Sequence, residues 1–145
     1  MNIFENYLSK INDIILDNKD DLNLNHTDNL KSVNLEVPQD HFNFDLSTNI
    51  CLVLSKVNKI DPKNLAKDIK KLLLENINHF ELIEIAGPGF LNIKLSKEGL
   101  ASNINEIFQN KEIFGSKKSN KTYNIEFVSA NPTGPMHVGH CRGAI

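Results

Sequence analysis

A Gly-Pro-Gly turn between two apolar runs constrains the fold of this chain more than any other feature. Residues 80–95 read FELIEIAGPGFLNIKL, so β-favouring residues stand on both sides of the turn. Glycine reaches positive φ without strain and proline holds φ near −65°, which makes the two typical of tight turns. The stretch therefore predicts a β-hairpin and, with it, an antiparallel sheet.

Four helices are expected around this hairpin. Apolar residues recur at helical spacing in residues 2–17, and a second helix is expected over 48–58. Asp61 as N-cap with Pro62 at the first position predicts a third helix, and Ser96 as N-cap predicts a fourth. The apolar residues of the fourth helix are expected to face the core: Leu100, Ile104, Ile107 and Phe108.

The remaining segments before residue 96 are shorter or more polar. Alternation of Val33, Leu35 and Val37 predicts a half-buried strand over 32–37, which Pro38 ends. The Asn- and Asp-rich residues before it, and the stretch QDHFNFDLS after it, are expected to be loops. Helices and a short antiparallel sheet together predict a small α+β domain over residues 1–110.

Composition and charge exclude several classes of protein. The 145 residues are 40% hydrophobic and 23% charged, which is typical of a soluble, folded chain. No apolar run approaches the roughly 20 residues of a membrane span, and no signal peptide is visible. Two cysteines without CxxC spacing favour a reduced, cytoplasmic setting.

Charge is uneven along the chain. The net charge is −2, but residues 1–46 carry three lysines against nine acidic residues, whereas residues 47–145 carry thirteen basic against nine acidic ones. Charge alone therefore does not indicate a nucleic-acid partner. If there is one, the later part of the chain is the expected contact.

A different pattern begins after residue 121. The basic stretch 111–121 lacks periodicity and is expected to be a linker, and residues 122–128, TYNIEFV, predict a new strand. A Pro/Gly turn and the start of a helix follow it. Residues 122–145 thus predict the first strand and helix start of a Rossmann-like α/β domain. Because a lone strand with an incomplete helix cannot bury itself, we expect the chain to be a fragment.

His137, Gly139 and His140 stand at that expected helix start. Unpaired N–H groups and the helix dipole suit phosphate there, and side chains three residues apart share one face. Gly139 lacks a side chain, so a flat base could approach the backbone. A partial metal site or a pair of surface histidines are the alternatives. The only further ligand nearby, Cys141, should point off their face, so no metal site is expected.

The stretch IEFVSANPTGPMHVGHCRGA closely resembles the nucleotide-binding motif of arginyl-tRNA synthetases, a class I aminoacyl-tRNA synthetase family. EIAGPGFLNIKL resembles the hairpin of that family's N-terminal domain, and FDLSTN is more weakly similar, with Phe44 where the family usually has glycine. The H-x-G-H alone is shared with many nucleotidyl transferases. The hairpin and the SANPTGP turn together indicate the arginyl family.

The resemblance implies a function for the whole protein and roles for single residues. The whole protein would join L-arginine to its tRNA through arginyl-adenylate, using ATP and Mg²⁺. The fragment alone would be inactive and would bind neither ATP nor Mg²⁺. His137 and His140 would be catalytic, and together with Gly139 they would bind ATP. Glu126, Ser129 and Asn131 would bind arginine. Phe90 and Asn92 would contact the tRNA elbow through its D-loop.

Each residue also has a structural alternative. Glu126 stands out within an apolar strand, where a carboxylate suits a guanidinium, but it could be a surface residue of an edge strand. Ser129 and Asn131 are also ordinary turn residues. Phe90 could be a core residue, whereas Asn92, between Leu91 and Ile93, could face solvent.

Two other functions stay open at this point. The chain could be a stand-alone RNA-binding module, or the product of a pseudogene with a vestigial motif. A small nucleotidyl transferase is a third possibility, but such enzymes usually begin with the motif strand rather than with a long preceding domain. The arginyl family is the favoured interpretation, and it implies a monomer in the cytoplasm with no membrane partner.

Overall fold

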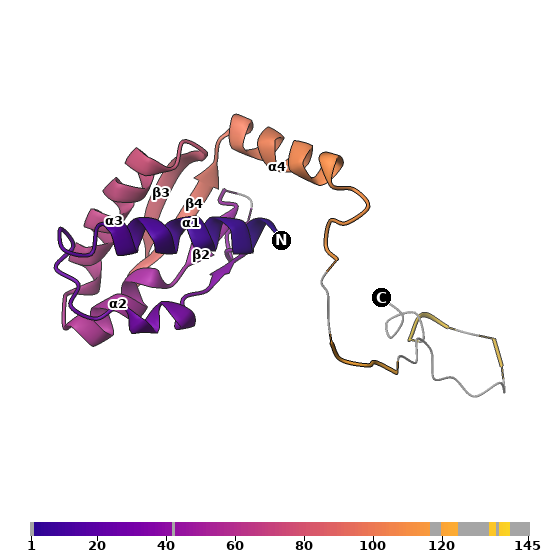
Figure 1. The fold of residues 1–145 in the computed structure, drawn as a ribbon, viewed down its shortest axis with the longest axis horizontal. Helices are drawn as coiled ribbons and strands as arrows, with labels where there is room; N and C mark the ends of the chain where they lie inside the picture. Colours follow the sequence, from indigo (N-terminus) through magenta and orange to yellow (C-terminus); the bar gives the residue numbers. More distant parts are fainter. Residues whose placement is uncertain (1, 42, 117–119, 125–133, 136, 140–145) are drawn as a thin grey trace.

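The computed structural model describes residues 2–41, 43–116, 120–124, 134–135 and 137–139. Four antiparallel strands form one sheet in the order β1-β2-β4-β3, and helices pack against it (Figure 1). The elements follow along the chain as α1 (Ile3–Asp17), the 3₁₀ helix η1 (Asp28–Ser32), β1 (Leu35–Glu36), β2 (Leu46–Thr48), α2 (Ile50–Asn58), α3 (Pro62–Asn76), β3 (Phe80–Ala86), β4 (Phe90–Leu95) and α4 (Lys97–Gln109). This arrangement confirms the predicted small α+β domain.

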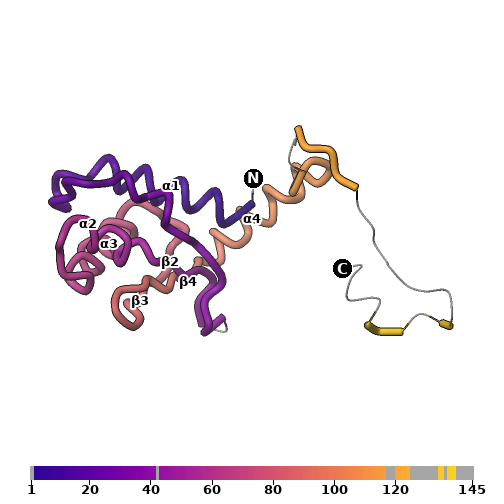
Figure 2. The backbone as a smooth tube through the Cα atoms, turned by 90° about the horizontal axis from the view of Figure 1, so that it is seen from below, coloured from indigo at the N-terminus to yellow at the C-terminus, as the bar shows by residue number. Residues whose placement is uncertain are grey.

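Three helices cover one face of the sheet. α1, α2 and α3 lie on the same side of the strands, as the view turned by 90° shows (Figure 2). Between the two layers lies a core of fully buried residues that includes Ile11 and Ile15 of α1, Leu54 of α2, and Leu91 and Ile93 of β4. No helix of the described residues covers the opposite face of the sheet.

The helix ends follow from the residues that cap them. Asp61 accepts a hydrogen bond from the N–H of Asn64 at 2.9 Å, and Pro62 begins α3, as predicted. Ser96 accepts one from the N–H of Gly99 at 3.1 Å at the start of α4. α1 begins with a capping box that the sequence reading had not identified, in which the side chain of Asn2 and that of Glu5 cap each other's backbone.

The predicted hairpin is present as β3 and β4. Its turn has positive φ at Gly87 (+54°) and Gly89 (+144°), and the N–H of Gly89 donates to the carbonyl of Ala86 at 3.2 Å. A Cβ on Gly89 would lie 3.2 Å from Cβ of Pro62. The turn therefore packs against the start of α3, which holds the hairpin tip in place.

Two strands differ from the prediction. β2 lies in the stretch expected to be a loop, because its three residues are held by pairing with β4, more than forty residues away in sequence. β1 is only two residues long, shorter than the expected strand over 32–37, and Val37 is 60% exposed. The alternation of apolar and polar residues predicted neither the presence of β2 nor the short length of β1. Each strand depends on hydrogen bonds to a partner strand that local sequence does not reveal.

The prediction for the apolar face of α4 is wrong. Leu100 is 42% exposed, Ile104 64% and Phe108 70%, whereas the residues of α4 that are buried are Gly99 and Asn103. α4 leaves the three-helix layer instead of lying on it (Figure 1). The amphipathic pattern correctly predicted a helix, but it could not predict whether a partner surface would lie beside it.

Within the described residues, no helix has both the length and the apolarity that crossing a bilayer requires. The strand expected over 122–128 and the helix start after it fall mostly outside the described residues, so the Rossmann-like opening stays a prediction.

Candidate nucleic-acid interface

A row of four polar residues crosses the uncovered face of the sheet. Strand pairing places Glu36 of β1 opposite Ser47 of β2, Ser47 opposite Asn92 of β4, and Asn92 opposite Glu84 of β3. Successive residues of a strand point to opposite faces, so the buried Leu91 on the helix side puts Asn92 on the open side. The row is therefore a consequence of the register between the strands.

Phe90 and Asn92 both belong to this open face. Each is partly exposed, and they are two residues apart on β4, so both side chains point the same way. Phe90 is not among the buried core residues, which removes the alternative that it is one. Asn92 faces away from the helices, as the sequence suggested. Their orientation fits the expected role, while the role itself stays a prediction.

A hollow of about 420 Å³ opens beside these two residues. Its volume lies within the range of about 300–1,000 Å³ that is typical of small-molecule sites. The loop from β1 to β2 forms one wall and the tip of the hairpin forms the other. The lining residues are Glu36, Val37, Pro38, Gln39, Asp40, Ser47, Ala86, Gly87, Phe90 and Asn92.

The charge of the hollow is negative. Among the described residues, the charged ones that line it are Glu36 and Asp40, and none is a lysine, arginine or histidine. Like charges repel, so the hollow disfavours a phosphate group. An aromatic ring and an amide instead suit a nucleobase, which stacks on one and hydrogen-bonds the other.

Asp45 supports this face in a way that the sequence reading missed. Its Oδ2 accepts the N–H of Leu95 at 2.8 Å, and its own N–H donates to the carbonyl of Ile93 at 2.9 Å. Phe44, where the resemblance suggests a glycine, is buried, with 8% of its surface exposed. The side chain and backbone of Asp45 thus extend the pairing of β2 with β4, and the neighbouring Phe44 is buried. A single aspartate in a polar loop carries no sequence signal for such a bond.

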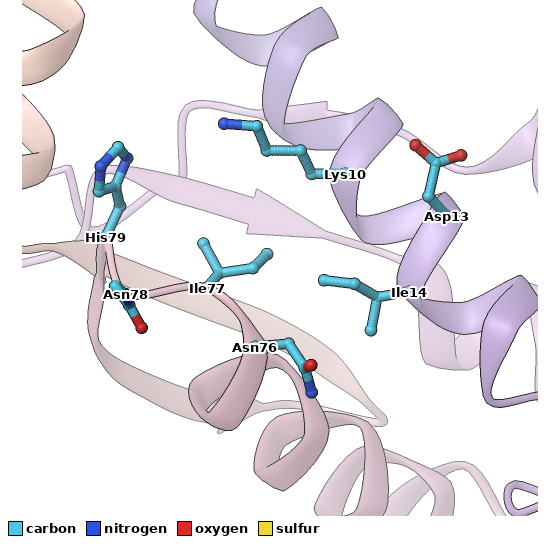
Figure 3. Close-up of a pocket in the computed structure, with 7 residues that line it drawn as sticks. All are labelled: Lys10, Asp13, Ile14, Asn76, Ile77, Asn78 and His79. Carbon is cyan, nitrogen blue, oxygen red and sulfur yellow. The ribbon is translucent and has the colours of Figure 1, made fainter.

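A second hollow, of about 400 Å³, lies on the helix side of the domain (Figure 3). Lys10 and Asp13 line it from α1, and His79 lines it from the turn that joins α3 to β3. The Nζ atom of Lys10 lies 5.6 Å from the ring centre of Tyr7. The hollow mixes one positive with one negative side chain, so its charge selects neither an anion nor a cation.

The predicted catalytic motif is only partly described. The N–H of Gly139 donates to Nδ1 of His137 at 3.1 Å, so the proton of the neutral ring belongs on Nε2. A Cβ on Gly139 would lie 2.9 Å from Cε1 of His137, and the glycine therefore makes room for the ring. Outside the described residues lie the other predicted site residues: Glu126, Ser129, Asn131 and His140. Among the described residues, no cluster of three or more His, Cys, Asp or Glu side chains could hold a metal ion.

Comparison with known proteins assigns the family. Residues 3–95 match the family model described as the arginyl tRNA synthetase N terminal domain. The chain belongs to the arginyl-tRNA synthetase family. The match covers the four-stranded sheet and α1 to α3, and it ends at Leu95, where β4 ends. The family resemblance drawn from the hairpin and the terminal motif is thereby confirmed.

Individual relatives in this family extend the match beyond residue 95. The chain is 44% identical over 147 residues to the arginine–tRNA ligase of Pelagibacter ubique, which covers all of this chain and 26% of that relative. It is 40% identical over 153 residues to that of Bartonella quintana, again covering all of this chain and 25% of the relative. It is 42% identical to that of Rickettsia felis over 83% of this chain and 21% of the relative. The chain therefore spans about a quarter of the length of the curated arginyl-tRNA synthetases it matches.

Proposed function

We propose that the whole protein ligates L-arginine to its tRNA through arginyl-adenylate, with ATP as substrate and Mg²⁺ as its counter-ion. This proposal is supported by the family match and by relatives that are named arginine–tRNA ligases. We further propose that residues 1–110 are the tRNA-binding domain, that 111–121 link it onward, and that 122–145 open the Rossmann-like catalytic domain. The 145-residue chain alone would be inactive, and the whole protein would act as a monomer in the cytoplasm.

The single observation that carries the tRNA-binding role is the partly exposed pair Phe90 and Asn92 at the hollow. A base of the tRNA elbow, from its D-loop, would stack on the ring of Phe90 and hydrogen-bond the amide of Asn92. Such recognition needs an unpaired base that can leave its stack, which loops provide and helices do not. The acidic walls favour a base over a phosphate, since Glu36 and Asp40 repel anions.

Contacts to the phosphate backbone would come from outside the hollow. α3 begins at the hairpin tip, because Gly89 packs against Pro62, and it carries the exposed Lys63 and Lys67. Lysines of this kind attract phosphates without reading sequence. Binding would therefore weaken as salt rises, while the base in the hollow supplies the specificity.

The catalytic roles belong to the second half of the proposal. His137 and His140 would stabilise the charge that develops on the phosphates of ATP, and Gly139 would lie under its adenine. Glu126, Ser129 and Asn131 would line the arginine pocket, where a carboxylate pairs with the planar guanidinium through two hydrogen bonds. The donor set suits this chemistry, since an Nε2 proton on His137 is a hydrogen-bond donor for a phosphate oxygen.

The test is a titration of the 145-residue chain with an arginine tRNA transcript at two salt concentrations. Asn92→Ala should weaken binding by about 1 kcal/mol, as for one lost neutral hydrogen bond. Asn76→Ala is the matched control, because that residue is exposed on α3 and its amide, among the described residues, donates only to the carbonyl of Leu72 in the same helix. Circular dichroism checks that each variant folds. Equal affinity of the wild type and Asn92→Ala would contradict the role of Asn92, and no binding at low salt would contradict the tRNA-binding role of the domain.

A further inference from the structure

Ser47 holds the amide of Asn92 in one orientation. Its Oγ donates to Oδ1 of Asn92 at 2.8 Å across the β2–β4 pair, and Ser47 is only 7% exposed. A hydroxyl carries one proton, and the acceptor that the described residues offer it is Oδ1 of Asn92. If the amide turned over, Nδ2 would donate to Oγ instead, and the hydroxyl proton of Ser47 would have no acceptor among the described residues, which costs free energy. The oxygen of Asn92 is thus held toward β2.

The other half of the amide must then point away from Ser47. Oxygen and nitrogen sit on opposite sides of the planar amide group, so the two Nδ2 protons face away from β2. No described residue accepts a hydrogen bond from Nδ2 of Asn92. Asn92, Ser47 and Phe90 all line the same hollow. The amide therefore offers hydrogen-bond donors beside an aromatic ring.

We propose that Ser47 is a positioning residue for tRNA binding, which turns the Asn92 amide so that its N–H donors meet an acceptor atom of the base next to Phe90. The inference rests on the proposed function, and it specifies which chemical group of the tRNA base is bound. The edge of the base that meets Asn92 must carry a hydrogen-bond acceptor, which is a carbonyl oxygen or an unprotonated ring nitrogen. A charged phosphate oxygen is disfavoured, because the carboxylates of Glu36 and Asp40 line the same hollow.

Preorganisation is the physical advantage of this arrangement. A free amide samples both orientations and only one presents donors, so binding to a freely turning Asn92 must first order it. Ser47 removes that ordering step before the tRNA arrives. Its contribution should depend on the amide it orients and vanish when that amide is absent.

A double-mutant cycle measures this dependence directly. Wild type, Ser47→Ala, Asn92→Ala and the double variant of the 145-residue chain would be titrated with an arginine tRNA transcript. Ser47→Ala should weaken binding about threefold to tenfold, the range of one neutral hydrogen bond. In the Asn92→Ala background the same change should have no further effect. Ser47→Thr keeps the hydroxyl and should restore most of the affinity.

Ser55→Ala is the matched control for these variants. Ser55 is also 7% exposed, but its hydroxyl donates to the carbonyl of Leu52 on α2, on the helix side of the sheet. Its loss should leave tRNA affinity unchanged. Thermal unfolding of every variant separates an effect on binding from an effect on the fold.

A spectroscopic signature reports the hydrogen bond without any tRNA. The ¹³Cγ resonance of Asn92 should move upfield in Ser47→Ala, because a carbonyl that loses its donor becomes more shielded, and it should not move in Ser55→Ala. An unchanged resonance overturns the inference. So does a loss of affinity in Ser47→Ala that persists in the Asn92→Ala background. A wild-type chain that binds no transcript overturns the proposed function instead, and the resonance then still decides whether Ser47 holds the amide.

Discussion

At the scale of single residues, Gly87 and Gly89 make different demands on the hairpin turn. Gly87 has φ +54° with open space around the position of a Cβ, whereas Gly89 has φ +144° and faces Pro62 and Leu52 at 3.2 and 3.4 Å. A left-handed φ near +54° strains an L-residue modestly. A φ near +144° belongs to a region that glycine alone enters readily. In the Gly-Pro-Gly turn, Gly87 should therefore tolerate substitution better than Gly89.

Gly89 gives a stability prediction. Gly89→Ala should lower the free energy of unfolding by about 2–3 kcal/mol, since the new methyl group adds a close contact with Pro62 to backbone strain. Gly87→Ala, the matched control in the same turn, should cost about 1 kcal/mol. Urea unfolding followed by circular dichroism measures both. Equal losses for the two variants would mean that the approach of Gly89 to α3 contributes nothing.

At the scale of elements, α4 is attached to the domain through its N-terminal half. The backbone at Gly99 lies against His79, where a Cβ would come within 2.9 Å of the histidine Cβ. One turn later, Asn103 donates from Nδ2 to the hydroxyl of Tyr7 at 3.0 Å, and that hydroxyl lies 2.9 Å from Nδ1 of His79. The hydroxyl of Tyr7 therefore links Asn103 to His79. Three elements thus meet at one buried hydrogen-bond chain.

The hydrogen bond from Asn103 to Tyr7 should limit local opening of α4. Asn103→Ala should speed hydrogen exchange of the α4 amides about fivefold, because the loss of one neutral hydrogen bond costs about 1 kcal/mol of local stability. Asn110→Ala is the matched control, since that amide bonds only to the carbonyl of Glu106 within the helix. Exchange measured by mass spectrometry on peptides of α4 gives the comparison. An unchanged rate in Asn103→Ala would place the attachment at Gly99 alone.

At the scale of the whole molecule, one continuous core runs from α1 to the end of β4. Cys51 lies at its centre on α2 with no exposed surface, and burial raises the pKa of its thiol from 9.0 to about 12. Burial also raises the pKa of Tyr7. A raised pKa means that the folded state holds its proton more tightly than the unfolded chain does. Both groups therefore stabilise the fold at neutral pH and lose that contribution in alkali.

The pH dependence follows from that shift. Below pH 9.0 the contribution of Cys51 should be fully present, and it should decline as the pH rises toward 12. Between pH 9 and 10.5 the wild type should lose about 1.6 kcal/mol more stability than Cys51→Ala, because the slope reaches 1.36 kcal/mol per pH unit only well above pH 9.0. Contributions from groups that both proteins share cancel in the difference. Urea unfolding in reducing buffer at several pH values measures it, and parallel curves for the two proteins would contradict a buried neutral thiol.

The sequence alone determined the parts of the molecule that depend on near neighbours. Asp61 and Ser96 cap helices because their acceptors reach N–H groups three residues away, and the hairpin follows from its own turn residues. Its pattern also placed Asn92 on the face opposite Leu91 and Ile93. The hairpin and the SANPTGP turn together were enough to indicate the family.

Only the tertiary structure decided the features that join distant parts of the chain. β2 exists because β4 pairs with it, and Ser47 reaches Asn92 across 45 residues of sequence. The exposed face of α4 has the same origin, since helical periodicity reports an apolar side but not whether another element lies against it. Local rules describe a few residues around each position. The hollow at Asn92 is assembled from the β1–β2 loop, β2 and the hairpin, and its shape and negative charge appear only when the sheet brings these segments together.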